Sequence, residues 1–260
     1  MSDPTASQAP SYPRVAIVTG ATSGIGEAIA RSFVAQGIAV VGNGRSADKL
    51  TELERELGAT FRGVAGDAGD AALIERLFET AADAFGRSAD IVVVNAGRGL
   101  GGSVKDADLG QFEDVLRINL SGALNLMQQA ARVMVEKQAT DYPQKPADIV
   151  VIGSVVGKHI SPFSAVYGST KFAVHSLAEG LRREIGPKGV RVTLVEPGIV
   201  ISGFQAVAGY ADDMVGKFED NWGPLLYGED IANAVQFVVD QPPHVHVSEI
   251  MVRPTRQDYP

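Results

Sequence analysis

Short apolar runs recur along the chain and alternate with longer amphipathic segments. The runs are rich in Val and Ile, and they occupy residues 15–19, 38–43, 60–66, 90–95, 148–154, 190–197 and 249–254. Four of them are almost unbroken Val and Ile, which is typical of strands that are buried on both faces. Helical periodicity marks the intervening segments at residues 25–36, 71–85, 109–137 and 172–185.

This alternation of strand and helix predicts a doubly wound α/β fold, in which a parallel sheet carries helices on both faces. Right-handed crossovers are expected between successive strands. Because the pattern is unbroken from residue 14 to residue 252, residues 14–260 are predicted to form one Rossmann-like catalytic domain.

Two segments fall outside the rhythm. Residues 1–13 are rich in Pro, Ser and Ala and have neither the basic start nor the apolar stretch of a secretory signal, so a disordered arm is expected. Residues 202–228 follow a strand and combine five aromatic side chains with five glycines. A mobile substrate lid is expected in such a place, and the alternative is a surface segment without a role.

Composition narrows the functional classes. The 260 residues are 45% hydrophobic and 21% charged, which is ordinary for a soluble globular protein. A net charge of -8 argues against a binder of nucleic acid or of anionic membrane. The absence of cysteine excludes thiolate catalysis and disulfides and is compatible with the cytoplasm. No apolar window is long enough to span a bilayer.

The first apolar run leads directly into a glycine-rich turn and then a helix. The turn reads Thr-Gly-Ala-Thr-Ser-Gly-Ile-Gly at residues 19–26. Gly20, Gly24 and Gly26 would let the backbone turn tightly, so that its N–H groups approach a pyrophosphate at the helix N-terminus. Thr22, Ser23 and Ile25 complete the predicted cradle. The spacing differs from the commoner GxGxxG, and a turn without a ligand is the alternative.

The end of the second predicted strand distinguishes the two nicotinamide cofactors. An acidic residue there would bind the ribose 2′-hydroxyl, whereas a basic residue accommodates a 2′-phosphate. The chain has Gly44, Arg45 and Ser46 at this point. Arg45 can donate to phosphate oxygens and Ser46 can add a hydroxyl, so NADP(H) is predicted in preference to NAD(H).

Tyr167 and Lys171 are four residues apart at the start of a predicted helix, so their side chains share one face. A free tyrosine has a pKa of about 10, too high for efficient proton exchange at neutral pH. A nearby ammonium favours the phenolate and lowers that pKa. The pair therefore predicts a general acid and base, with Lys171 also able to donate to the nicotinamide ribose.

Three further positions carry candidate polar residues, and two of them lie where predicted strands end. Ser154 ends the fifth strand, and Asn95, Ala96 and Gly97 end the fourth. In α/β folds, ligands bind at the carboxyl ends of the strands. Asn119 lies within the long predicted helix, where a buried amide needs a partner, either a structural one or a water of a proton relay.

As a set, these residues resemble the short-chain dehydrogenase/reductase family in its single-domain branch, and the resemblance covers residues 14–254. It rests on the turn at Gly20, Gly24 and Gly26, on Asp67, on Asn95-Ala96-Gly97, on the tetrad Asn119, Ser154, Tyr167 and Lys171, and on Pro197, Gly198 and Ser202.

The resemblance implies a seven-stranded sheet of order 3-2-1-4-5-6-7 and a homotetramer or homodimer. Asp67 resembles the family's adenine contact. The segment with Pro197, Gly198, Val200 and Ser202 resembles the one that holds the nicotinamide amide. Three residues depart from the family's common pattern: Val94 replaces Asn, Ser202 replaces Thr, and Ser23 replaces the basic residue of many NADP-dependent members.

Substrate-facing residues are expected in the loops above that edge, with Arg98, His159 and Phe163 as candidates beside Ser154 and Tyr167. A carboxylate substrate would need a cation, which Arg98, Lys158 or His159 could supply. The tail at residues 241–259 resembles the branch that acts on 3-hydroxy acids such as serine, and also small polyol or aldehyde reductases. His244 and His246 lack an evident third metal ligand, so no metal is expected. A structural role is expected for His175.

The sequence thus predicts an oxidoreductase that interconverts a small alcohol and its carbonyl compound by hydride transfer. Ser154 and Tyr167 would bind the substrate oxygen, and Tyr167 would exchange the proton, which returns through Lys171, the ribose hydroxyl and water held by Asn119. The alternatives are a sugar epimerase or a dehydratase on the same fold, and a non-catalytic regulator that senses a dinucleotide.

Overall fold

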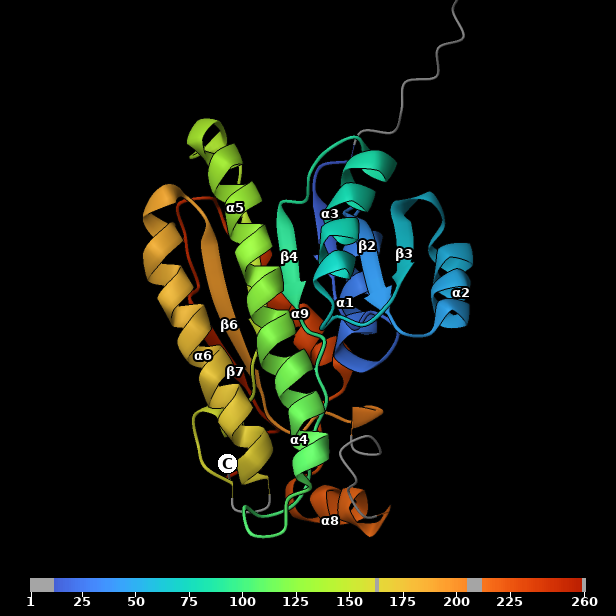
Figure 1. Ribbon diagram of the computed structural model, residues 1–260, viewed down its shortest axis with the longest axis vertical. Coiled ribbons are helices and arrows are strands. Elements are labelled where there is room, and N and C mark those ends of the chain that lie inside the picture. The colour runs from blue at the N-terminus through green and yellow to red at the C-terminus, as the bar shows by residue number, and fades with distance from the viewer. Residues whose placement is uncertain (1–11, 162–163, 205–211, 259–260) are drawn as a thin grey trace, which may run out of the picture.

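The computed structural model describes residues 12–161, 164–204 and 212–258 (Figure 1). Seven parallel strands form one sheet in the order β3-β2-β1-β4-β5-β6-β7, which confirms the predicted fold class. The strands are β1 (Val15–Val18), β2 (Ala39–Gly44), β3 (Phe61–Ala65), β4 (Ile91–Val94), β5 (Asp148–Ile152), β6 (Arg191–Pro197) and β7 (Glu249–Val252).

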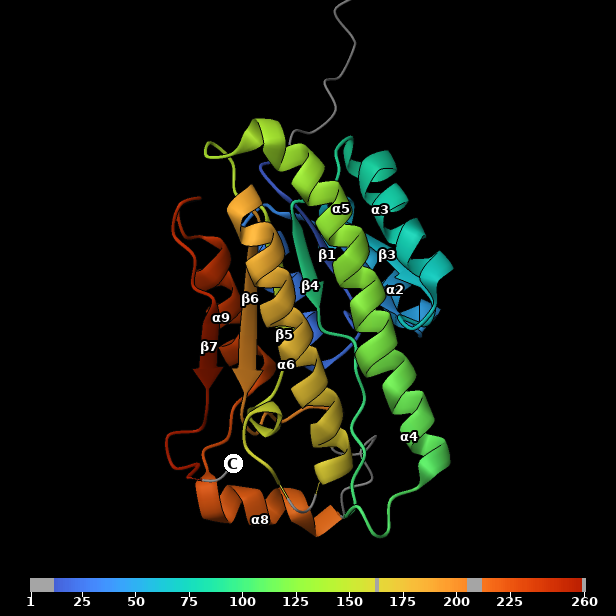
Figure 2. The ribbon, with the colours of Figure 1, turned by 60° about the vertical axis from the view of Figure 1, so that its left-hand side comes forward.

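Helices cover both faces of this sheet, as Figures 1 and 2 show. One face packs against α3 (Ala71–Phe85), α5 (Ala123–Asp141) and α6 (Ala165–Ile185). The other packs against α1 (Gly24–Ala35), α2 (Ala47–Leu57) and α9 (Gly228–Val239). Side chains alternate between the two cores along β1, with Val15 and Ile17 in one and Ala16 and Val18 in the other. Burial on both faces explains why the strands read as unbroken apolar runs.

The long helix expected at residues 109–137 is interrupted. It consists of α4 (Leu109–Leu116), one π-helical turn at Arg117–Gly122, and α5. At the end of this turn the helix passes close to the loop after β3, because a Cβ on Gly122 would stand 2.5 Å from the carbonyl oxygen of Ala68. Isolated π turns within helices often occur at functional sites, and this one contains Asn119.

The two irregular segments are only partly described. Residues 1–11 of the predicted arm lie outside the described residues. Tyr12 stacks edge-on against Phe85 at 5.2 Å, and its hydroxyl donates to the carbonyl of Ala59. In the predicted lid, residues 205–211 lie outside the described part, and the remainder includes helix α8 (Asp212–Trp222).

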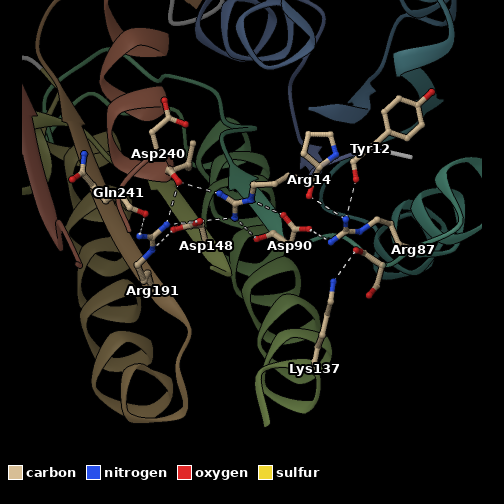
Figure 3. Close-up of polar contacts among 12 residues, drawn as sticks. Tyr12, Arg14, Arg87, Asp90, Lys137, Asp148, Arg191, Asp240 and Gln241 are labelled. Atoms are coloured by element: carbon tan, nitrogen blue, oxygen red, sulfur yellow. Dashed lines mark hydrogen bonds and ion pairs between the residues drawn. The ribbon is translucent and has the colours of Figure 1, made fainter. Parts of the chain in front are cut away.

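The N-terminal edge of the sheet carries a buried ionic network (Figure 3). Asp148, at the start of β5, accepts from Arg14 at 2.6 Å and from Arg191 at 2.7 and 2.9 Å. Arg14 also donates to Asp90 at 2.8 Å, and Arg87 donates to the second oxygen of Asp90 at 2.9 Å. The network ties together the beginnings of β1, β4, β5 and β6.

None of the helices among the described residues is both long and apolar enough to cross a membrane.

Candidate active site

The opposite edge of the sheet, where the strands end, surrounds one large cavity. Its volume is ≈ 1330 Å³, and its walls come from the loops after β1, β2, β4, β5 and β6 together with α6 and α8. Carboxyl ends of parallel strands are the usual ligand-binding edge of an α/β fold. The predicted cofactor and catalytic residues are distributed around this one space.

The glycine-rich turn joins β1 to α1 at the cavity wall. Gly20 and Gly24 have φ values of 69° and 54°, in the left-handed region that favours glycine. A Cβ on Gly26 would stand 2.2 Å from the carbonyl oxygen of Gly20, so only glycine permits this close approach. Gly20, Thr22, Ser23, Gly24 and Ile25 line the cavity, whereas Gly26 packs behind them.

The end of β4 holds this turn in place. Asn95 donates through Nδ2 to the carbonyl of Thr19 at 2.8 Å, and the backbone N–H groups of Asn95 and Ala96 donate to Thr19 Oγ1, each at 3.1 Å. Asn95, Ala96 and Gly97 also line the cavity. The Asn-Ala-Gly segment therefore supports the cradle and forms part of its wall.

Arg45 stands exposed at the end of β2, on the cavity lining. Ser46 does not line the cavity, and its hydroxyl accepts the N–H of Lys49 at 3.3 Å and caps α2. Asp67 lines the cavity and pairs with Arg117 at 2.8 Å. That hydrogen bond to Arg117 is the largest of the contacts that lower the pKa of Asp67, and the charge of Arg45 adds to them.

Helix α6 brings Tyr167 and Lys171 to the cavity, both of them buried. The Lys171 ammonium donates to the carbonyl of Ile152 at 2.9 Å and lies 5.9 Å from the centre of the Tyr167 ring. Burial lowers the pKa of Lys171 to about 8. The tyrosine ring packs against Phe204, with their centroids 5.5 Å apart.

Ser154 and Asn119 occupy different positions relative to the cavity. Ser154 lines it at the end of β5, and its hydroxyl accepts the N–H of Val156 at 3.3 Å. Asn119 lies behind the wall, where Oδ1 accepts the N–H of Arg98 and Nδ2 donates to the carbonyl of Arg98, both at 2.9 Å. Nδ2 also lies 3.3 Å from Thr170 Oγ1. Asn119 thus joins the loop after β4 to the helix that carries the tyrosine.

The end of β6 and the segment after it line the cavity through Pro197, Gly198, Val200 and Ser202. Its support comes from the C-terminal tail, because Gln257 Oε1 accepts the N–H of Ile199 at 3.0 Å. Gln257 is buried and lines the cavity itself. Sequence reasoning missed this residue, since nothing in a tail sequence indicates which distant backbone group it will meet.

The predicted substrate contacts differ in whether they line the cavity. Arg98 lines the cavity, His159 is exposed and outside the lining, and Phe163 lies outside the described residues. Lys158 forms ion pairs with Glu249 and Glu196. Helix α8 adds lining residues that sequence reasoning did not name: Lys217, Phe218, Asn221 and Trp222. Across the described ranges, no three metal-ligating side chains are grouped so as to hold a metal ion.

Comparison with known proteins finds relatives that span nearly the whole chain. Residues 14–210 match the family model for short chain dehydrogenase. An uncharacterized oxidoreductase of Staphylococcus aureus is 34% identical over 242 residues, which cover 93% of this chain and 97% of the relative.

Two solved structures share the fold closely. A serine dehydrogenase in its closed form, complexed with NADP+, has a TM-score of 0.84 and 33% identity, covering 94% of this chain and 96% of its own. A 3-ketoacyl-(acyl-carrier-protein) reductase from Brucella melitensis, complexed with NADH, has a TM-score of 0.85 and 26% identity, with 94% and 98% covered.

Proposed function

The chain belongs to the short-chain dehydrogenase family and is an oxidoreductase, and we propose that it uses NADP(H) to interconvert a small alcohol and its carbonyl compound. A hydroxy acid or a polyol is the proposed alcohol. One observation carries the proposal: Tyr167, Lys171 and Ser154 line the same cavity as the glycine-rich cradle. Proton exchange and dinucleotide binding can therefore occur side by side.

The residues present fit a dinucleotide. Cβ atoms on Gly20 and Gly24 would stand 2.8 Å from Asn95 Nδ2 and 2.9 Å from Ser202 Cβ, so side chains there would push the cradle apart. The cradle would hold the pyrophosphate against the start of α1. Asp67 would contact the adenosine portion, and the segment from Pro197 to Ser202 would hold the nicotinamide amide.

Arg45 supports NADP(H) over NAD(H). It is an exposed cation on the cavity lining, and β2 ends without the acidic residue that a 2′-hydroxyl would require. A guanidinium binds phosphate oxygens in a forked geometry. The NADP+ in the similar serine dehydrogenase favours the same choice, whereas the NADH in the 3-ketoacyl reductase shows that the fold accepts both.

When bound, the nicotinamide supplies a hydride to the carbonyl carbon or accepts one from the alcohol. Ser154 and Tyr167 donate hydrogen bonds to the substrate oxygen, and Tyr167 gives it a proton as the carbonyl is reduced. In the oxidising direction, Tyr167 takes that proton back. Lys171, with its pKa of about 8, is mostly an ammonium at neutral pH, and its nitrogen lies 5.9 Å from the centre of the Tyr167 ring, where a positive charge favours the phenolate.

Of the two proposed alcohols, a hydroxy acid would be anionic at one end. Arg98 is the candidate partner of its carboxylate, because it lines the cavity and its guanidinium has only long contacts, with Asp114 at 3.6 Å and Gln111 at 3.5 Å. The likeness to a serine dehydrogenase supports a 3-hydroxy acid. His159 and Phe163 remain proposed substrate contacts.

A homotetramer or homodimer is proposed for the assembly. Leu124 on α5, Phe172 on α6 and Phe237 on α9 are large apolar side chains with 44%, 42% and 53% of their surface exposed. Leu124 and Phe172 lie on helices of one face of the sheet and Phe237 on a helix of the other, so they would belong to two separate contacts with other copies of the chain.

The function is tested by following nicotinamide absorbance with purified protein. NADPH is offered with aldehydes, ketones and β-keto acids, and NADP+ with hydroxy acids and polyols. We expect turnover on a member of this panel, and Tyr167→Phe should lower kcat by about 10²- to 10⁴-fold while NADP+ still binds. Tight NADP+ binding with no turnover on the whole panel favours the regulator instead. Full activity of Tyr167→Phe contradicts the proposed proton donor.

A further inference from the structure

We propose that His175 is a positioning residue for Ser154, and that Glu196 selects which ring nitrogen of His175 faces the serine. This inference rests on the proposed function, in which Ser154 binds the substrate oxygen. His175 lies on α6 four residues after Lys171 and eight after Tyr167. Because steps of four stay on one helical face, the same face presents all three side chains to the end of β5.

The imidazole of His175 fills a slot beneath the serine loop. A Cβ on Gly153 would stand 2.3 Å from its Nε2 atom, and a Cβ on Gly157 would stand 2.4 Å from its Cε1 atom. These glycines lie on either side of Ser154, so the ring packs directly against the backbone that carries the hydroxyl. Only 11% of the His175 side chain is exposed.

The hydrogen bond to the serine has a defined direction. The backbone N–H of Ser154 donates to Nε2 of His175 at 3.2 Å. An accepting nitrogen carries no proton, so the proton of the neutral ring belongs on Nδ1. A second proton on Nε2 would point at the serine N–H and break this contact. Burial, assisted by the charges of Lys171 and Lys158, lowers the pKa of His175 to about 4 and keeps the ring neutral.

Glu196 provides the reason for that choice of nitrogen. It lies on β6 with none of its surface exposed, and its Oε1 atom is 3.3 Å from Nδ1 of His175. Its Oε2 atom is 3.6 Å from the ammonium of Lys158. A carboxylate beside Nδ1 favours a proton there and leaves Nε2 free to accept, as carboxylates do behind metal-bound histidines.

Stability alone does not account for Glu196. Neither carboxylate oxygen has a hydrogen bond of ordinary geometry within the described residues. The ion pair with Lys158 at 3.6 Å only partly offsets the burial of this carboxylate, and apolar replacement of buried charges is often neutral or stabilising. The position of Glu196 beside Nδ1 of His175 therefore indicates a role in orienting that ring.

Kinetics of matched variants test the positioning role. His175→Leu removes the acceptor at similar size and should lower kcat by about 10- to 100-fold, because a small displacement of a reacting group has effects of this order. The Kd for NADP+ should stay within about twofold, since the cradle is untouched. His175→Gln places an amide oxygen where Nε2 stands and should restore most of kcat. His246→Leu is the control, because His246 contacts the carbonyl of Val192 at 2.9 Å, away from the cavity.

The chemical shifts of the ring nitrogens report the tautomer of His175 independently of enzyme activity. The chain has four histidines, so the ¹⁵N spectrum of histidine-labelled protein is simple. We expect His175 to carry its proton on Nδ1 at neutral pH. Glu196→Leu should reduce that preference and lower kcat by about tenfold, with no decrease in the urea midpoint.

The outcomes separate this inference from the proposed function. A proton on Nε2, or wild-type kcat in His175→Leu, overturns the positioning role. The role is also overturned if His175→Leu lowers kcat and weakens NADP+ binding while His175→Gln fails to restore kcat. That pattern indicates general disruption of the fold. Ser154→Ala serves as the reference: its full activity would remove the serine from the proposed function, whatever the tautomer.

Discussion

The two edges of the sheet bury charge in opposite ways. At the edge where the strands begin, Arg14 and Arg191 pair with Asp90 and Asp148 at 2.6 to 2.9 Å. At the edge where they end, the Lys171 ammonium is buried with a carbonyl as its partner. Within the described ranges no ion pair includes Lys171. The first arrangement holds strands together, and the second leaves a charge available for chemistry.

The comparison shows what burial does to a charged group. Desolvation disfavours every buried ion, and only partners can offset it. Arg14 keeps a raised pKa although burial alone would lower it, because Asp148 and Asp90 stabilise its charge. Lys171 has no carboxylate partner among the described residues, and its pKa falls to about 8. Perturbed groups that line a cavity are candidates for function, whereas groups balanced by partners serve the fold.

The largest expected effect on stability is at the N-terminal edge. Asp148→Ala leaves Arg14 and Arg191 without their shared carboxylate and should lower the free energy of unfolding by about 3 to 5 kcal/mol. Urea denaturation at fixed protein concentration measures the change, and turnover below the midpoint should stay near wild type. Glu179→Ala, which removes an exposed pair with Arg182, is the control and should change little. An equal shift in both variants would contradict the structural role of this edge.

Lys171→Met tests the edge where the strands end, and it should raise the free energy of unfolding, whereas Asp148→Ala lowers it. The pKa of Lys171 is about 8 in the folded chain against 10.5 in the unfolded chain. Below pH 8 both states are protonated and the folded state bears the whole cost of burial. Since one pKa unit corresponds to 1.36 kcal/mol, Lys171→Met should stabilise the protein by up to about 3 kcal/mol at neutral pH.

That gain has a pH dependence and a cost in activity. Between about pH 8 and pH 10.5 the folded protein loses this proton more readily, so wild-type stability rises and the advantage of Lys171→Met disappears. Turnover should fall about 100-fold or more. Urea midpoints at both ends of this range measure the gain, with Lys105→Met as a surface control. If Lys171→Met proved less stable than wild type, Lys171 would stabilise the fold, as Arg14 and Arg191 do.

The smallest effect concerns an exposed charge at the cavity. Arg45→Ser should lower kcat/KM for NADPH by about 10- to 100-fold through the loss of a phosphate contact worth roughly 1.5 to 3 kcal/mol. In the same variant, kcat/KM for NADH and the urea midpoint should hardly change. Arg76→Ser, on the exposed face of α3, is the matched control. Wild-type protein that prefers NADH would refute the assignment of Arg45 before any variant is made.

The sequence by itself determined the fold class and many of the residues at the cavity. Unbroken Val and Ile runs indicated strands buried on both faces, and the spacing of Tyr167 and Lys171 placed them on one helical face. Such patterns are legible because they arise from local geometry, with fixed periods for strand and helix. The same local rule identified the glycine turn, since φ values above zero select glycine within a few residues of chain.

Only the tertiary structure decided which distant polar groups meet. Gly122, at the end of the π turn that contains Asn119, packs against the carbonyl of Ala68, and Gln257 in the C-terminal tail accepts the N–H of Ile199. The sequence predicts a structural role for His175, and only the fold brings Ser154 and Glu196 to its two ring nitrogens. Hydrogen-bond partners far apart in sequence leave no period in it, because packing in three dimensions selects them.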